Sequence, residues 1–152
     1  MVFKSLDELV AYTKNQIKAS MPEVGKKMKE IMKEEIDRQV YSGYTPQGVW
    51  RPDLWGGRTY DLLNSLDVTE LSSNSVTSEI QNNGKWFDAF SKNPAFPMER
   101  LEKGTVWGAG GTRKEPNFRP KTNIMIESET KVRAEIPLCF KSTMNGLGVP
   151  VE

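Results

Sequence analysis

Residues 20–43 read SMPEVGKKMKEIMKEEIDRQVYSG. Apolar side chains recur in this stretch at steps of three and four residues, the spacing that places them on one face of an α-helix. They are Val24, Met28, Ile31, Met32, Ile36 and Val40. Lys and Glu alternate between them, and pairs four residues apart, such as Glu23 and Lys27, stabilise a solvated helix face. The stretch therefore predicts a helix of about six turns with one buried face, ended by Gly43.

A second amphipathic segment precedes this helix. Ser5 and Glu8 have the spacing of a capping box, in which the serine oxygen accepts from the Glu8 amide and the carboxylate reaches back to the cap. The apolar residues of one face follow as Leu6, Leu9, Val10 and Ile17. Residues 20–23 repeat this device, with Pro22 in a position that suits a first helical turn. We therefore expect either a second helix or a kinked continuation of the first to begin there.

The centre of the chain predicts a short helix followed by a β-hairpin. Thr59 can cap a helix whose apolar residues are Leu62, Leu63 and Leu66. Val68 and Leu71, then Val76 and Ile80, stand among polar residues as in two short strands. The Ser-Ser-Asn-Ser sequence of residues 72–75 between them suits a tight turn.

Residues 124–147 fit two patterns. Even-numbered positions from Ile124 to Phe140 alternate as in a strand, whereas another apolar set recurs at helical spacing. That set is Met125, Val132, Ile136, Phe140, Met144 and Leu147, with Gly146 and Gly148 as a stop. Pro137 would kink the helix or open a second one, and it would equally restrict a strand to a sheet edge. We favour the helix, and the strand stays open as the alternative.

Three long irregular stretches, about 44–58, 82–98 and 104–120, carry many of the aromatic residues, and a short helix is expected around 98–103. Loops of this length inside a compact domain are usually functional or disordered unless partners order them. Tryptophan is costly to leave in water, so the rings either cover the edge of the core or contact another chain. The candidate subunit-interface residues are Tyr44, Trp50, Trp55, Trp86, Phe87, Phe90, Trp107, Arg113, Lys114, Phe118 and Arg119.

The composition limits the class of protein. A chain of 152 residues with 37% hydrophobic and 27% charged residues fits one soluble domain over residues 1–152. No apolar run approaches the roughly 18 residues that span a bilayer, and the acidic start does not fit a signal peptide. The single cysteine, Cys139, agrees with folding in a reducing cytoplasm. We therefore expect no membrane association and no export.

The residue types argue against an enzyme. The chain has no histidine, which removes the Ser-His-Asp and Cys-His arrangements and the commonest zinc sites. Cys139 lies between Leu138 and Phe140 and is expected to be a small buried hydrophobic residue. The glycines of residues 108–111 lack the Gly-Lys-Ser/Thr ending of a phosphate-binding loop. We therefore expect no catalytic site, no cofactor and no metal.

The basic residues of 113–121 leave one alternative open. Arg113, Lys114, Arg119 and Lys121 stand against only one acid, Glu115, and lie near two aromatic residues. Such a segment can contact phosphates, although it lacks a helix that reads a groove. The net charge of the whole chain is only +1, so any nucleic-acid contact would be local. An interaction module that contacts nucleic acid through this loop is the alternative function.

Several of these motifs, taken in order, resemble one family. They are residues 40–46 (VYSGYTP), 58–65 (RTYDLLNS), 101–105 (LEKGT), 118–120 (FRP) and 144–149 (MNGLGV). The chain resembles the small head–tail connector and tail-completion proteins of tailed bacteriophages and prophages, also described as minor capsid or minor tail components. The resemblance covers most of the chain. This sequence departs from the family pattern between Pro46 and Arg58, in residues 82–98 and at Lys121.

The resemblance implies both a fold and a function. The fold would be α+β, with a long N-terminal helix packed on a small antiparallel β-sheet, further short helices and long interface loops. The function would be that of a structural virion protein, made in the bacterial host cytoplasm and placed at the head–tail junction or tail end. The partners would be further copies of the chain in a ring, usually of six, together with a portal-side connector and tail-tube or tail-terminator proteins. A weak contact with DNA in the channel is also expected.

Overall fold

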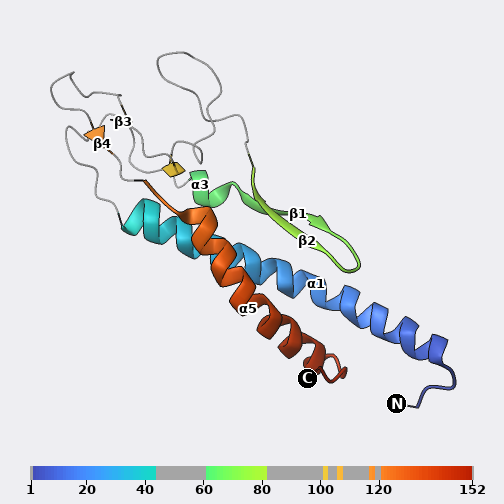
Figure 1. Ribbon diagram of the computed structural model, residues 1–152. Helices are drawn as coiled ribbons and strands as arrows, with labels where there is room; N and C mark the ends of the chain where they lie inside the picture. The colour runs from blue at the N-terminus through green and yellow to red at the C-terminus, as the bar shows by residue number, and fades with distance from the viewer. Residues whose placement is uncertain are drawn as a thin grey trace. The chain divides into compact units, whose positions relative to one another are not determined.

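The computed structural model describes residues 2–43, 61–81, 101–102, 106–107, 117–118 and 121–151 (Figure 1). Its elements, in chain order, are α1 (Leu6–Ile36), the π-helix η1 (Asp37–Ser42), α3 (Asp61–Asn64), β1 (Leu66–Leu71), β2 (Val76–Ile80), β3 (Val106–Trp107), β4 (Asn117–Phe118) and α5 (Ile124–Gly146). A long N-terminal helix, a small two-stranded antiparallel sheet and further helices confirm the predicted α+β class.

The chain divides into two compact units. The first unit contains Met1–Ile31, Asp67–Glu79 and Ser128–Glu152, and the second contains Met32–Leu66 and Ile80–Glu127. The boundaries fall inside α1, β1, β2 and α5, and each unit is described by itself below. The assignment of residues 1–152 to one domain stays a prediction.

Helix α1 begins at the predicted cap. The Ser5 Oγ accepts a hydrogen bond from the Glu8 amide at 3.2 Å, which satisfies one of the amides that a helix start leaves without a partner. The Glu8 carboxylate accepts from the Lys4 amide at 2.7 Å instead of the Ser5 amide. The capping box is therefore half confirmed, because its return hydrogen bond is made one residue earlier.

Helix α1 continues through Pro22, so of the two alternatives at residues 20–23 the first helix continues and no second helix begins. The Ser20 Oγ donates to the Ile17 carbonyl at 2.7 Å inside the helix and does not cap a new one. Pro22 cannot donate the helical hydrogen bond to residue 18, but both positions are exposed to solvent, where water can replace it. Burial of Met21 and Val24, each 6% exposed, stabilises the helix across the proline.

The end of the helical run is confirmed at Gly43, but its last turns differ from an α-helix. Residues 37–42 form the π-helix η1, and Gly43 is its C-cap. The Ser42 Oγ donates to the Asp37 carboxylate five residues earlier, at 2.8 Å. A side chain at Gly43 would overlap the Arg38 carbonyl oxygen, so only glycine fits where this wider turn closes.

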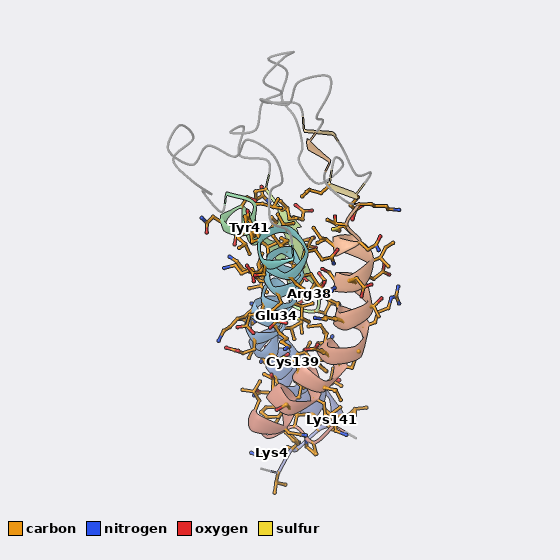
Figure 2. The ribbon with its side chains drawn as sticks, turned by 90° about the vertical axis from the view of Figure 1, so that its left-hand side faces the viewer. Lys4, Glu34, Arg38, Tyr41, Cys139 and Lys141 are labelled. Atoms are coloured by element: carbon orange, nitrogen blue, oxygen red, sulfur yellow. The ribbon has the colours of Figure 1, made fainter. Side chains whose placement is uncertain are left out.

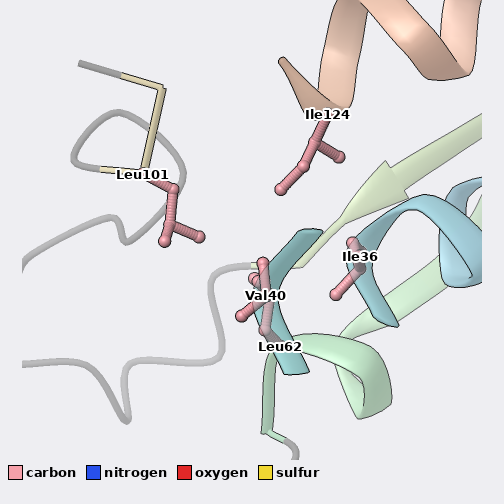
Figure 3. Close-up of a cluster of buried hydrophobic side chains, with 5 residues drawn as sticks. All are labelled: Ile36, Val40, Leu62, Leu101 and Ile124. Carbon is pink, nitrogen blue, oxygen red and sulfur yellow. The ribbon is translucent and has the colours of Figure 1, made fainter. Parts of the chain in front are cut away.

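The core of the second unit is a cluster of five buried side chains (Figure 3). They are Ile36, Val40, Leu62, Leu101 and Ile124. Tyr41, Leu63 and Ile80 pack against the cluster. Leu62 comes from the predicted short helix, α3, but Leu66 is already the first residue of β1, so its assignment to that helix is wrong. The proposed cap, Thr59, lies outside the described residues, as does most of the helix expected around 98–103, of which Leu101 and Glu102 are helical.

The predicted hairpin is confirmed, and in the first unit it packs on α1. Strands β1 and β2 pair in one sheet, and the Ser72 amide donates to the Ser75 carbonyl at 2.9 Å in the turn. A Cβ at Gly25 would lie 3.1 Å from Val76 Cγ1 and 3.3 Å from Val68 Cγ2. The hairpin valines therefore contact α1 where the helix carries no side chain.

The C-terminal segment is a helix, as favoured, and not a strand. Helix α5 spans Ile124–Gly146 with Pro137 inside it, and Gly148 follows with φ +82°, the left-handed conformation of a helix stop. Ile124 and Met144 are buried. Val132, Ile136, Phe140 and Leu147 are half-buried. Met125, which was expected on the buried face, is 47% exposed, because Ile124 takes the inward position one residue earlier.

Part of the loop predicted at 104–120 forms a β-ladder. Strands β3 and β4 are antiparallel, with Val106 opposite Phe118 and Trp107 opposite Asn117. Their nine-residue separation and glycine-rich connection gave no alternating pattern that would predict pairing. The expectation of a loop without strands is therefore wrong at these four residues.

Replacing Gly43 by Ala should destabilise the second unit by about 1–3 kcal/mol, the usual cost of forcing atoms into filled space, since the new Cβ would meet the Arg38 carbonyl. Urea unfolding followed by circular dichroism would measure this change. Gly146→Ala is the matched control, because nothing lies within 4 Å of a Cβ at that position. Equal losses in the two variants would contradict the close contact at Gly43.

Asp67 should contribute stability that depends on pH. Its pKa is lowered from 3.8 because its carboxylate accepts from the Val68 amide and from Lys29, whose Nζ lies 3.2 Å from Asp67 Oδ1. A lowered folded-state pKa contributes stability above pH 3.8 that is lost as the pH falls through the lower value. The stability difference between the wild type and Asp67→Asn should therefore be constant near neutral pH and shrink in acid. A difference independent of pH from neutrality to pH 2 would contradict it.

Candidate interaction surfaces

Most of the predicted interface residues lie outside the described part of the chain. Tyr44, Trp50, Trp55, Trp86, Phe87, Phe90, Arg113, Lys114 and Arg119 fall there, and so does most of the basic 113–121 loop of the alternative function. Trp107 and Phe118 lie on β3 and β4, where the ladder brings their two backbone segments together. Their role at an interface stays a prediction.

The first two turns of α1 expose apolar side chains along one face. Leu6 is 74% exposed, Leu9 41% and Val10 42%, and we call these three residues the α1 stripe. Their spacing continues the face on which Met21 and Val24 are buried further along the same helix. The sequence predicts that Leu6, Leu9 and Val10 share one apolar face, and periodicity identifies the face of a helix but not what covers it. The structure leaves this end of the face uncovered.

In the first unit α5 covers α1 beyond the hairpin, and its contacts end near Tyr12. The Tyr12 hydroxyl donates to the Leu147 carbonyl at 3.3 Å, and Lys27 pairs with Glu135 at 2.7 Å. The order of these contacts shows that the two helices run antiparallel (Figure 1). The Phe3 ring lies 5.2 Å from the Tyr12 ring, centroid to centroid. Helix α5 ends at Gly146. The α1 stripe therefore lies beyond the end of α5.

A second exposed apolar surface lies on α5. Leu138 is 68% exposed, and Ala134 and Pro137 beside it on the helix are also exposed; we call these three residues the α5 patch. Lys141 follows one turn later and is exposed as well (Figure 2). Cys139 is half-buried, less buried than expected. The patch was not identified from the sequence, because Leu138 fits the strand pattern and not the helical one.

A buried carboxylate organises the polar contacts of the second unit. Glu35 is fully buried, and its Oε2 accepts from Arg38 Nη2 at 2.5 Å, Arg38 Nε at 3.1 Å and Gln39 Nε2 at 2.8 Å. Gln39 also accepts from the Asn123 amide at 2.8 Å. Glu35 therefore holds the side chains that connect η1 to the start of α5.

The start of α5 is capped by side chains from elsewhere in the second unit. Glu102 Oε1 accepts from the Met125 amide at 3.2 Å, and Gln39 accepts from the Asn123 amide. A carboxylate at the N-terminus of a helix is also favoured by the helix dipole. These contacts satisfy the amides that would otherwise be open to an anion, so this helix start is a structural joint.

The ion pair between Arg38 and Glu35 holds parts of the fold together. The pKa of Arg38 is raised because its guanidinium donates to the Glu35 carboxylate and is attracted by its charge. Three donors converge on Glu35 Oε2, so this oxygen is occupied by hydrogen bonds within the fold. In this arrangement the carboxylate positions two side chains.

Two properties of the described residues bear on other classes of function. Within the ranges that the structure describes, no three His, Cys, Asp or Glu side chains gather so that they could bind a metal ion. None of the described helices is both long and apolar enough to cross a lipid bilayer. The expectations of no cofactor and no enzymatic activity stay predictions.

The described residues thus carry two uncovered apolar surfaces and a polar cluster that connects parts of the second unit. The family model for YomN matches residues 5–145. The chain therefore belongs to the YomN family, which is phage-derived, and it is a phage-associated protein. No curated protein and no solved structure matches the chain.

Replacing Glu35 by Ala should lower the free energy of unfolding by about 1–3 kcal/mol, because Gln39 and Arg38 lose their acceptor inside the fold. Glu34→Ala is the matched control: Glu34 is the neighbouring acid on the exposed face of α1, and its loss should change stability by less than about 0.5 kcal/mol. Thermal unfolding of both variants would measure the difference. Equal stability of the two would show that the Glu35 contacts do not organise this unit.

Proposed function

We propose that this phage-associated protein is a structural virion subunit that forms a ring in the neck or at the end of the tail. The ring joins the DNA-filled capsid to the tail. Membership of a phage-derived family supports this proposal, and so does the α+β fold, which agrees with the fold implied by the resemblance to head–tail connector and tail-completion proteins. The proposal includes no enzymatic activity.

The observation that carries the proposal is the α1 stripe. Single exposed apolar residues are normal on protein surfaces, but these three share one face and continue a buried one. Removing a leucine side chain from water contributes roughly 1.5–3 kcal/mol, so a neighbour that covers the stripe gains free energy. The stripe stands on a helix whose other turns are held by α5 and the hairpin, so it is presented in a fixed conformation before any partner binds.

The partners follow from this position. Further copies of the chain would complete the ring, and portal-side connector and tail-tube or tail-terminator proteins would contact its two faces. DNA passing through the channel would make only weak contacts, since the net charge of the chain is +1 and non-specific DNA affinity rises with the number of phosphate contacts. A joining subunit needs specific surfaces and a stable core, and it needs no reactive side chain.

Deleting the gene from its phage or prophage should stop joining and leave genome packaging intact. We expect lysates to contain DNA-filled heads without tails if the ring belongs to the neck, or separate tails with abnormal ends if it belongs to the tail. Negative-stain electron microscopy and DNA content of sedimented heads would measure both. Complementation with the wild-type gene is the control. Normal joined, infectious particles from the deletion would refute the structural role.

A further inference from the structure

The first unit carries two different uncovered apolar surfaces, the α1 stripe and the α5 patch. Leu6 and Leu138 are its most exposed leucines, at 74% and 68%. The α1 stripe lies beyond the end of α5. The α5 patch lies on the face of its helix away from α1, because Val132, Ile136 and Phe140 occupy the half-buried face. One subunit therefore presents two separate surfaces of similar chemistry.

The charges beside the two surfaces are opposite. Asp7 is adjacent to Leu6 in the first turn of α1, and Lys141 follows Leu138 by three residues on α5. Neither side chain has an ion-pair partner among the residues that the structure describes. Two other charged residues near the patch, Arg133 and Glu135, are paired with Glu129 and Lys27. Lys4 and Glu8 are also exposed at the start of α1, where the Lys4 amide donates to the Glu8 carboxylate.

We infer that the α1 stripe of one copy binds the α5 patch of a second copy, with Asp7 opposite Lys141. This inference rests on the proposed function and names the contact that would build the ring. The leucines supply the apolar centre of the contact, and the two charges fix its pairing. Because the two surfaces differ, each subunit uses one surface on each neighbour. Such head-to-tail contacts generate closed rings when the rotation closes.

The charges disfavour the simplest alternative, in which two α1 stripes pair around a two-fold axis. Centring such a pair on the stripe would bring Asp7 of one copy close to Asp7 of the other. Shifting it along α1 would move the second copy toward the end of α5, which the Tyr12–Leu147 hydrogen bond places there. A stripe-to-patch contact avoids both difficulties. It is one part of the interface, since a stable interface usually needs about 800 Å² per partner.

Two complementary variants test the contact. Leu6→Glu blocks only the stripe, and Leu138→Glu blocks only the patch; both side chains are mostly exposed, so circular dichroism should show unchanged folding. Native mass spectrometry of each variant alone should give monomers under conditions where the wild type forms rings. An equimolar mixture should give one-to-one dimers and nothing larger, because each copy retains the surface that the other lacks. Asn15→Glu, which adds the same charge on the opposite, exposed face of α1, should leave rings intact.

Exchanging the charges tests the pairing itself. Asp7→Lys and Lys141→Asp should each weaken ring formation by about two- to tenfold, the range for an exposed ion pair made repulsive, and the double variant should recover the loss. Rings that persist in Leu138→Glu, dimers from stripe–stripe pairing, or a wild type that stays monomeric at high micromolar concentration would each overturn the inference. The proposed function would survive these results if the deletion still gives unjoined particles.

Discussion

The apolar face of α1 is the constraint on which the rest of the structure depends. Helix α1 has 31 residues, and most of the stability of a helix in a protein comes from packing one face. In the first unit Val68 and Val76 of the hairpin cover that face at Gly25, and α5 covers it through contacts from Glu135 to Leu147. In the second unit Leu62, Leu101 and Ile124 surround Ile36 and Val40. The hairpin and α5 are therefore held in the first unit by the part of this face that they cover.

The elements that could be predicted from sequence are those whose signal is local. The three- and four-residue spacing from Val24 to Val40 identifies a helix without reference to anything else, and Ser72–Ser75 identifies a turn because these side chains bond to nearby backbone. The helical stops at Gly43 and Gly148 were also predictable, since one closes against a carbonyl and the other adopts a positive φ. For α5 the sequence favours a helix but also allows a strand, because its residues fit both periods.

The features that could not be predicted depend on contacts between distant residues. Pro22 is normally a helix breaker, but burial of Met21 and Val24 carries α1 across it. Glu35 has the sequence pattern of a solvated acid, and only its position between Arg38, Gln39 and the start of α5 explains its burial. No alternating pattern in the sequence predicts the pairing of β3 with β4. For the candidate surfaces the same reasoning applies: periodicity placed Leu6 on an apolar face, but the length of α5 determines that it is uncovered.

The α1 stripe lies where it contributes little to the stability of the folded chain and is available for contact with another protein. Leu6, Leu9 and Val10 lie at the end of the helix, beyond the contacts that hold the first unit together, so polar substitutions there remove little packing from the folded chain. Free energy gained by covering these residues would therefore stabilise the proposed assembly and not the single subunit. In a protein whose proposed role is to join two preformed parts of a particle, this separation has a consequence: the subunit can fold and persist before its neighbours arrive. The hydrophobic gain then favours the assembled state only when the neighbours are present.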